Sequence, residues 1–244
     1  MNKSEAIKLV KKDPLNLAYV GRELELDPEV VMIAIQKEPL MLWRCEEEIC
    51  NNRDIILTAV KGNGNSLQFA SNTLCNDREI VLTAVYGAGS ALEYASERLR
   101  DDKEIVHIAV SKYGKSLQYA SEILRADKEI VLAAVKNDGS VLKFASNELK
   151  NDKEVVQVAI ENYPHSLQYA SEMLCGDKEI VLIAVKNYGS VFRFASYDLR
   201  NDEEVVRVAI SNFPRALEHA SPEIQKFILA KNYRSKESNQ KYIF

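Results

Sequence analysis

Few residues of this sequence have the type and spacing that catalysis requires. The three histidines, His107, His165 and His219, are far apart in the chain, and we interpret them as unpaired surface side chains. The sequence contains no phosphate-binding loop, dinucleotide fingerprint, zinc-protease motif or serine-hydrolase motif. Asp–Glu pairs recur at regular spacing, but helix capping accounts for them. We therefore predict no catalytic residue, no metal site and no cofactor.

The elements that would position any site come from a 25-residue phrase that repeats without insertion or deletion. It reads ADKEIVLAAVKNDGSVLKFASNELK at 126–150 and NDKEVVQVAIENYPHSLQYASEMLC at 151–175. Nine such units cover residues 1–225. A fixed period of this length indicates a repeat architecture. Positions are numbered 1–25 within each unit below, so that unit 6 is residues 126–150.

Positions 3–12 of each unit predict a helix, named helix A here. Position 2 is Asp in most units, as in Asp127, and a short carboxylate there caps the first turn. Positions 5, 6, 9 and 10 are apolar and form one arc of the helix. Position 14 is Gly or Pro, as in Gly139 and Pro164. Gly is expected to end helix A in a left-handed conformation, and Pro because it lacks a donor.

Positions 15–20 predict a second helix, with an apolar face at positions 16, 17, 20 and 24. Position 20 is Ala and position 21 is Ser from Ala70–Ser71 to Ala220–Ser221. The serine either caps a last short turn or bonds back to a carbonyl of the second helix. Each helix–turn–helix unit cannot bury its apolar face alone. The sequence therefore predicts an all-α fold, an α-solenoid of about nine repeats in a right- or left-handed superhelix.

The predicted domain organisation follows the regularity of the units. The first two units match the pattern loosely and are interpreted as a cap, because one face of a terminal repeat meets water. Trp43 is assigned to this cap, with contact to a ligand as the alternative. A capping helix is predicted near 222–232, because Ser-Pro-Glu is a helix start. The predicted boundaries are two divergent capping repeats at 1–50, seven regular repeats at 51–225, and the end of the capping helix with a mobile tail at 226–244.

Composition narrows the class of partner and the compartment. The formal net charge is −4 with 28% charged residues, which argues against a generic nucleic-acid binder. The sequence contains no run of about 18 apolar residues, so no membrane span is predicted. The start, MNKSEAIKLVKKDP, lacks the apolar core of a secretory leader. The predicted location is the cytoplasm, or a host cell if the chain is a translocated effector.

The cysteines Cys45, Cys50, Cys75 and Cys175 are predicted to be free thiols in a reducing compartment. Three of them end a unit, and equivalent sites in stacked units are separated by about 10 Å or more. A disulfide requires Cα atoms within about 7 Å. No CxxC spacing or neighbouring His favours a metal.

From unit 4 onward the units alternate, which gives a superperiod of 50 residues. Position 7 is Leu in the even units and polar or cationic in the odd ones, and position 15 changes from Ser to a cationic residue or His. Duplication of a two-unit ancestor explains this pattern. The alternative is a ladder that binds a partner protein. That alternative gives eight candidate partner-binding residues: His107, Lys115, Gln118, Gln157, His165, Gln168, Arg207 and Arg215.

A second ladder is aromatic and occupies position 19. We expect it to pack in the core or along a groove wall, with ligand stacking as the alternative. The mixture of Tyr and Phe favours a partly hydrated edge. Its members are Phe69, Tyr94, Tyr119, Phe144, Tyr169 and Phe194.

The phrase at 126–150 resembles a repeat family filed as a domain of unknown function, numbered four-one-one-six. The resemblance is strong over 51–225 and weak over 1–50. Members of that family occur in intracellular bacteria, where some are translocated effectors, and in protists and large DNA viruses. The resemblance implies a fold and a cellular context but no catalytic residue. The matching residues of unit 6 are Asp127, Lys128, Glu129, Ile130, Val131, Leu132, Ala134, Val135, Gly139, Leu142, Phe144, Ala145, Ser146 and Leu149.

These observations predict a non-catalytic scaffold that binds a protein partner, such as a host protein if the chain is a bacterial effector. A nucleic-acid-binding solenoid is the first alternative, and it requires Lys and Arg clustered on one surface. A solenoid enzyme is the second, and it requires ionisable groups of several units to converge. The chain is expected to be a monomer or to self-associate weakly.

Overall fold

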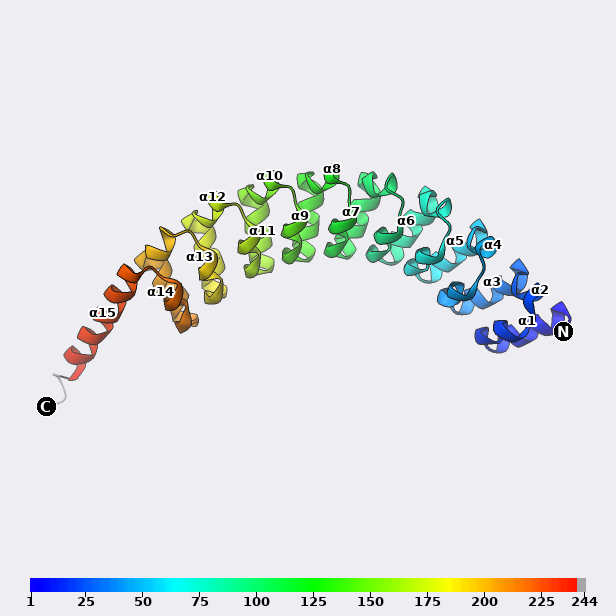
Figure 1. The fold of residues 1–244 in the computed structure, drawn as a ribbon, viewed down its shortest axis with the longest axis horizontal. Helices are drawn as coiled ribbons and strands as arrows, with labels where there is room; N and C mark the ends of the chain where they lie inside the picture. Colours follow the sequence, from blue (N-terminus) through cyan, green and yellow to red (C-terminus); the bar gives the residue numbers. More distant parts are fainter. Residues whose placement is uncertain (241–244) are drawn as a thin grey trace. The chain divides into compact units, whose positions relative to one another are not determined.

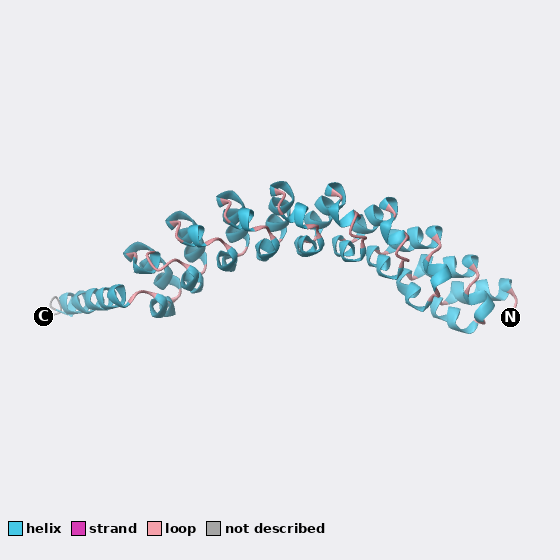
Figure 2. Ribbon diagram, turned by 45° about the horizontal axis from the view of Figure 1, so that its top comes forward, coloured by secondary structure: helices cyan, strands magenta, loops and turns pink. Residues whose placement is uncertain are grey.

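The computed structural model describes residues 1–240 of the chain. Its contacts divide the chain into two compact parts, an N-terminal part, Met1–Asn137, and a C-terminal part from Asp138 onward, and each is described by itself. Every regular element in the described range is a helix, and successive repeats pack side by side within each of the two parts (Figures 1 and 2). The predicted all-α solenoid of repeats is confirmed.

The N-terminal part repeats a ten-residue α-helix, a six-residue 3₁₀ helix (denoted η) and a third helical segment of three or four residues. Its elements are α1 (Lys3–Lys12), η1 (Pro14–Tyr19), α2 (Arg22–Glu25), α3 (Pro28–Lys37), η2 (Pro39–Arg44), α4 (Glu47–Cys50), α5 (Arg53–Gly62), η3 (Gly64–Phe69), η4 (Leu74–Asn76), α6 (Arg78–Gly87), η5 (Gly89–Tyr94), η6 (Leu99–Asp101), α7 (Lys103–Lys112), η7 (Gly114–Tyr119), α8 (Glu122–Arg125) and α9 (Lys128–Asn137).

The C-terminal part continues the same order and ends in a longer helix. Its elements are η8 (Gly139–Phe144), α10 (Asn147–Lys150), α11 (Lys153–Asn162), η9 (Pro164–Tyr169), α12 (Glu172–Cys175), α13 (Lys178–Asn187), η10 (Gly189–Phe194), η11 (Leu199–Asn201), α14 (Glu203–Asn212), η12 (Pro214–His219) and α15 (Pro222–Gln240).

Helix A forms as predicted, over positions 3–12 of each unit. In α13, Asp177 accepts hydrogen bonds from the backbone N–H groups of Glu179 and Ile180, which satisfies two donors of the first turn. Positions 5, 6, 9 and 10 are fully buried from α3 to α13, and only position 10 of α14 is less so. The core of each unit is therefore a continuous row of Ile, Val and Ala side chains. Burial of this row is the main source of stability.

The expected left-handed glycine at position 14 is wrong. Among residues 1–240 the one positive φ belongs to Gly21, at 93°. Helix A ends instead because position 13 is extended, as in Tyr188 with φ −141° and ψ 91°. The glycine is needed for close packing, because a Cβ on Gly189 would lie 2.3 Å from the carbonyl oxygen of Ala209 in the next helix A.

The second helix is a 3₁₀ helix at positions 14–19 rather than an α-helix at 15–20. It starts at the Gly or Pro itself, as in η10 from Gly189 to Phe194. Pro164 and Pro214 begin η9 and η12, where the missing N–H of proline removes no helical bond. Extended residues on both sides limit the segment to six residues, a length at which 3₁₀ geometry is common.

Position 16 is buried, as expected, but in some odd units it carries a polar side chain. Ser116 and Ser166 are fully buried. Each hydroxyl donates to the carbonyl of the position 14 glycine in the preceding unit, at 2.8 Å for Ser116 to Gly89 and 2.7 Å for Ser166 to Gly139. These bonds remove the cost of burying a hydroxyl.

Position 21 serine caps a third helical segment, which resolves the two alternatives left by the sequence. Ser171 accepts a hydrogen bond from the N–H of Leu174 in α12 and donates to Asn151 Oδ1 at 2.5 Å. Its own N–H donates to the carbonyl of Lys150. Each unit thus holds three helical segments, and the serine connects the third to the start of the same repeat.

The C-terminal end of the chain differs from the expectation in the length of its last helix. Helix α15 runs from Pro222 to Gln240 instead of ending near 232, since 223–240 contains no Gly or Pro. The predicted mobile tail is therefore helical through Gln240, and its last residues, 241–244, lie outside the described residues. Trp43 is 60% exposed on η2, with the Arg44 guanidinium carbon 5.1 Å from its ring centroid.

Candidate interaction surface

The recurring carboxylates form ion-pair clamps between successive repeats. The cation at position 3 of one unit binds Asp at position 2 and Glu at position 4 of the next. Lys153 Nζ lies 2.7 Å from Asp177 Oδ2 and 2.8 Å from Glu179 Oε2. The described clamps join Lys3 to Asp27 and Glu29, Arg53 to Asp77 and Glu79, Arg78 to Asp102 and Glu104, Lys103 to Asp127 and Glu129, Lys153 to Asp177 and Glu179, and Lys178 to Asp202 and Glu204.

Both departures from this clamp are compensated. Unit 2 has Pro28 at position 3, and unit 3 has Asn52 in place of Asp at position 2, so the capping oxygen stays but the charge is lost. Unit 9 has Glu203 at position 3. That carboxylate lies 2.9 Å from Lys231 Nζ on α15 and 2.8 Å from Arg207 Nε. A charged residue at position 3 is therefore opposite in charge to the side chains with which it pairs in the next repeat or in α15.

The clamps shift the ionisation of their members toward the charged forms. The hydrogen bond from Lys153 lowers the pKa of Asp177, although partial burial of the carboxylate opposes the shift. Hydrogen bonds to Asp127 and Glu129 raise the pKa of Lys103 to about 12. The helix-start carboxylates thus serve capping and repeat packing. Among residues 1–231, whose side chains the structure describes, no group of three or more His, Cys, Asp or Glu is arranged to hold a metal ion.

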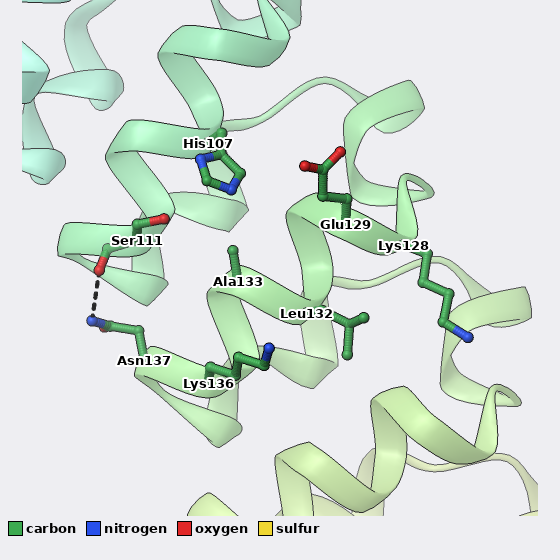
Figure 3. Close-up of a pocket in the computed structure, with 8 residues that line it drawn as sticks. All are labelled: His107, Ser111, Lys128, Glu129, Leu132, Ala133, Lys136 and Asn137. Carbon is green, nitrogen blue, oxygen red and sulfur yellow. Dashed lines mark hydrogen bonds between the residues drawn. The ribbon is translucent and has the colours of Figure 1, made fainter.

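The surface between consecutive A helices is hollowed at the same repeat positions in the N-terminal part and in the C-terminal part. One hollow of about 670 Å³ lies between α7 and α9, and Figure 3 shows its residues. There, His107 on α7 and Ala133 on α9 point toward the space between the two helices, while Asn137 Nδ2 donates to the carbonyl of Ser111 at 3.1 Å. The lining residues are His107, Ser111, Lys128, Glu129, Leu132, Ala133, Lys136 and Asn137.

Two further hollows share the lining positions of one helix A, but their second helix follows that helix A in the chain, whereas α7 precedes α9. One, of about 450 Å³, lies on α13 and α14, and the other, of about 420 Å³, lies on α3 and the start of α5. In all three the lining includes positions 3, 4, 7, 8 and 11 of one helix A, with an apolar residue at positions 7 and 8. Those apolar pairs are Leu132 and Ala133, Leu182 and Ile183, and Met32 and Ile33.

The predicted candidates between Met1 and Asn137 lie on two different helical segments, α7 and η7. His107 is half-buried and lines the hollow between α7 and α9. Lys115 and Gln118 are exposed on η7 and do not line that hollow. The structure therefore assigns position 7 and positions 15 and 18 to different helical segments of the repeat.

In the C-terminal part, each of the two candidates at position 7 forms a hydrogen bond with a side chain of its own helix. Gln157 Nε2 donates to Glu161 Oε1 at 2.8 Å on α11. Arg207 Nε donates to Glu203 Oε1 at 2.8 Å on α14. Both side chains are half-buried. Contact with a partner would have to compete with these local bonds.

The remaining three candidates lie on the 3₁₀ helices. Gln168 Nε2 donates to the carbonyl of His165, and Arg215 is exposed at the start of η12. His165 is not a simple surface histidine, because its ring lies between Tyr163 and Tyr188, with ring centroids 5.3 and 5.6 Å away. Its Nδ1 is shielded from solvent and has no hydrogen-bond partner. His165 and Gln168 are the only pair of the eight joined by a described hydrogen bond.

The aromatic ladder at position 19 is half-buried throughout, in agreement with the predicted partly hydrated edge. Cations lie over several of these rings, with Lys143 Nζ 4.8 Å from the Phe144 centroid and Arg193 Cζ 4.6 Å from that of Phe194. The rings thus pack against the body on one side and contact cations on the other.

Sequence reasoning missed the clamps and the hollows. The clamps had a signal, because Lys or Arg at position 3 precedes a unit with Asp at position 2 and Glu at position 4. The hollows had a weaker one. Leu182 and Ile183 lie outside the buried arc of helix A and remain apolar, as do Met32 and Ile33.

The cysteines and the membrane question also have structural answers. All four cysteines are free and half-buried. The Cys175 thiol lies 3.5 Å from the carbonyl oxygen of Leu167, in a site that the repeat also provides for Cys75. No helix in the part of the chain that the structure describes is both long enough and apolar enough to cross a membrane.

Comparison with known proteins identifies a family without an assigned activity. The family described as Domain of unknown function (DUF4116) matches residues 2–50, 52–100, 86–125, 127–175 and 177–225. Its repeat is about 50 residues long, so each match spans up to two of the 25-residue units. This length equals the superperiod of 50 residues, and the longer matches begin at both odd and even units, namely units 1, 3, 6 and 8. No curated protein and no solved structure matches the chain. The chain thus belongs to the DUF4116 family, as a tandem array of its repeats.

Proposed function

We propose that this protein is a non-catalytic scaffold that binds another protein through a surface repeated along its helices. The observation that carries the proposal is the recurrence of one hollow, with positions 3, 4, 7, 8 and 11 of helix A in its lining, at three places. A solenoid presents side chains at fixed spacing, and such extended surfaces suit protein recognition. In its finer form, the proposal is that the chain is a bacterial effector that binds a host protein.

The repeat needs few of its surface residues for folding. Capping and inter-repeat pairing occupy positions 2, 3 and 4, and positions 5, 6, 9 and 10 form the core. Side chains at positions 7, 8, 11, 15 and 18 vary between units while the backbone does not. Variation on a constant scaffold is how repeat families adapt one fold to different partners.

The test is chemical cross-linking of the purified full chain in a lysate, followed by mass spectrometry of the captured proteins. The candidate ladder is tested with the triple substitution Lys115→Glu, His165→Glu and Arg215→Glu. The matched control changes three exposed lysines on other segments, Lys8, Lys12 and Lys226, to Glu. We expect one protein to be captured by the wild type and the control and lost by the triple variant.

Other outcomes would change the proposal in defined ways. A partner that the triple variant retains would show that the ladder is not the contact surface. Nucleic acid released by salt from the captured material would favour the nucleic-acid alternative instead. Absence of any cross-linked protein would contradict the scaffold function. Injection of a reporter fusion into host cells, or its failure, would test the effector form separately.

A further inference from the structure

We propose that the hollow on α13 and α14 binds an acidic segment of a partner protein, with a large apolar side chain of that segment on Leu182, Ile183 and Val208 and a carboxylate on Lys186. This inference rests on the proposed scaffold function and specifies its surface and the chemistry of its partner. The hollow measures about 450 Å³ and is also lined by Lys178, Glu179 and Glu204. Its size is that of sites that hold a few side chains rather than a whole domain.

The apolar floor of this hollow is not required by the core. Leu182, Ile183 and Val208 are half-exposed, whereas the four core positions of α13 are fully buried. Other units carry polar residues at the same places. Position 7 is Gln157 or Arg207 in the neighbouring units, and position 8 is Thr58 and Thr83 in units 3 and 4. A cluster of aliphatic side chains at a hydrated hollow, where the fold tolerates polar ones, indicates a binding surface.

The charges around the hollow leave one cation available. Lys178 Nζ is bound to Asp202 Oδ2 at 2.8 Å and Glu204 Oε2 at 2.9 Å, and Glu179 is bound to Lys153. Lys186 has no described acidic partner within 4 Å. Its backbone is held in place, because Asn212 Nδ2 donates to the Lys186 carbonyl at 3.0 Å. The rim therefore presents an unpaired ammonium on a fixed backbone, beside an apolar floor.

This pattern selects for the kind of partner. A carboxylate next to a bulky apolar residue satisfies both the floor and Lys186. A nucleic acid or a phospholipid surface brings several phosphates, some of which would lie near Glu179 and Glu204 in the same hollow and be repelled, whereas a single carboxylate can bind Lys186 alone. The other large hollow, between α7 and α9, has Ala133 where this one has Ile183, and its second helix contributes His107 and Ser111 instead of Val208. Its floor is less apolar, so the hollow on α13 and α14 should bind the apolar anchor more strongly.

The probe is a phage-displayed library of random 12-residue peptides, selected on the immobilised full chain. Enriched peptides are then synthesised with a fluorophore and titrated by fluorescence polarisation. We expect the enriched sequences to share an aromatic or aliphatic residue within a few positions of Asp or Glu. The double variant Leu182→Gln with Ile183→Thr should weaken binding at least about tenfold, because an apolar anchor in a pocket carries much of the binding energy.

Two further variants separate charge from shape. Lys186→Glu should also weaken binding about tenfold or more at low salt, with a smaller difference at high salt because exposed charges are screened. Met173→Gln is the control, because Met173 is 64% exposed on α12 and does not line the hollow. It should leave the affinity unchanged. Gln and Thr occur at these positions in other repeats, so the double variant should keep the helical circular dichroism signal.

The outcomes distinguish this inference from the function on which it rests. Peptides that bind the hollow variants normally but lose affinity in the Lys115, His165 and Arg215 triple would overturn the assignment of the hollow and leave the scaffold function intact. Basic or uniformly polar peptides would overturn the chemistry proposed for the partner. No enrichment would overturn the inference as well, and the cross-linking experiment would still decide the scaffold function independently.

Discussion

Lys153 of unit 7 and Asp177 of unit 8 form a bond that serves two helices at once. Lys153 Nζ lies 2.7 Å from Asp177 Oδ2, while Asp177 Oδ1 accepts hydrogen bonds from the N–H groups of Glu179 and Ile180 at 3.0 and 3.2 Å. One carboxylate therefore caps its own helix and connects it to the preceding repeat. This double role links local helix formation to repeat stacking.

The first prediction separates these two roles. Asp177→Ala removes both the cap and the ion pair, and the loss of the cap alone should cost about 1 kcal/mol of unfolding free energy. Asp177→Asn keeps the capping oxygen, as Asn52 does in unit 3, and should cost less. Lys153→Ala removes only the exposed ion pair and should have the smallest effect. Urea denaturation followed by circular dichroism measures all three. Equal losses for Asn and Ala would show that the charge, rather than the cap, dominates.

The second prediction concerns acid. Hydrogen bonds from Lys3, Lys103 and Lys153 lower the pKa values of Asp27, Asp127 and Asp177 in the folded protein. An unfolded Asp has a pKa of about 3.9. The unfolded chain thus binds more protons in this range, so the stabilisation is complete above about pH 4 and is lost as the pH falls through the folded pKa values. The melting temperature should be nearly constant from about pH 5 to pH 8 and fall below about pH 4.

A control for the acid prediction uses the same clamp. Asp177→Asn cannot titrate at this position, so its melting temperature should fall less steeply below about pH 4 than that of the wild type. The same slope in both proteins would show that other carboxylates control acid unfolding. At the basic end, the raised pKa of Lys103, about 12, predicts that its contribution persists past the unfolded value and disappears as the pH rises through about 12.

The third prediction concerns the glycine at position 14. A Cβ on Gly189 would lie 2.3 Å from the Ala209 carbonyl oxygen and 2.4 Å from Asn212 Oδ1. Gly189→Ala should therefore destabilise the C-terminal part by about 1–3 kcal/mol, the usual range for overpacking. Gly176→Ala is the matched control, because its nearest contact would be 3.4 Å and its φ is −97°. Thermal melts should show a loss for Gly189→Ala, and no change or a small gain for Gly176→Ala. A loss of similar size in both would contradict the steric explanation.

The fourth prediction concerns thiol reactivity. Burial raises the pKa of Cys45 to about 12. At pH 8 only about one Cys45 side chain in ten thousand is then a thiolate, the reactive form. Cys45 should be alkylated by iodoacetamide far more slowly in the native protein than in urea. Mass spectrometry of tryptic peptides at several times measures this rate. A native rate equal to that in urea would show that the thiol is not shielded.

Much of the fold could be predicted because the repeat states the same pattern many times. The capping Asp and the four core positions of helix A follow from local hydrogen bonding and from helical periodicity, and both are determined within about ten residues. The expected left-handed glycine was wrong because Gly189 is constrained by Ala209 in the next repeat, a contact that no single unit contains. The type and the start of the second helix were wrong, since the extended residues at positions 13 and 20 enclose six residues of 3₁₀ helix that begin at position 14.

The candidate surface was less predictable. Helical periodicity correctly placed position 7 outside the buried arc, but it did not show that Arg207 is bound to Glu203 or that His165 lies between two tyrosines. Periodicity assigns a side chain to a face, whereas its partners come from neighbouring units. The hollows arise from pairs of helices, so no single helical wheel reveals them.

The number of units, the all-α class, the start of each helix A and the composition of the core follow from the residue order alone. These depend on interactions within one turn or one helix face, which the residue order specifies directly. The packing of successive repeats, in contrast, was needed to show that Lys153 pairs with Asp177, that Ser166 bonds to Gly139, and that Leu182, Ile183 and Val208 line one hollow. Those relationships join residues that lie more than one helix apart, and they depend on how one repeat packs against the next.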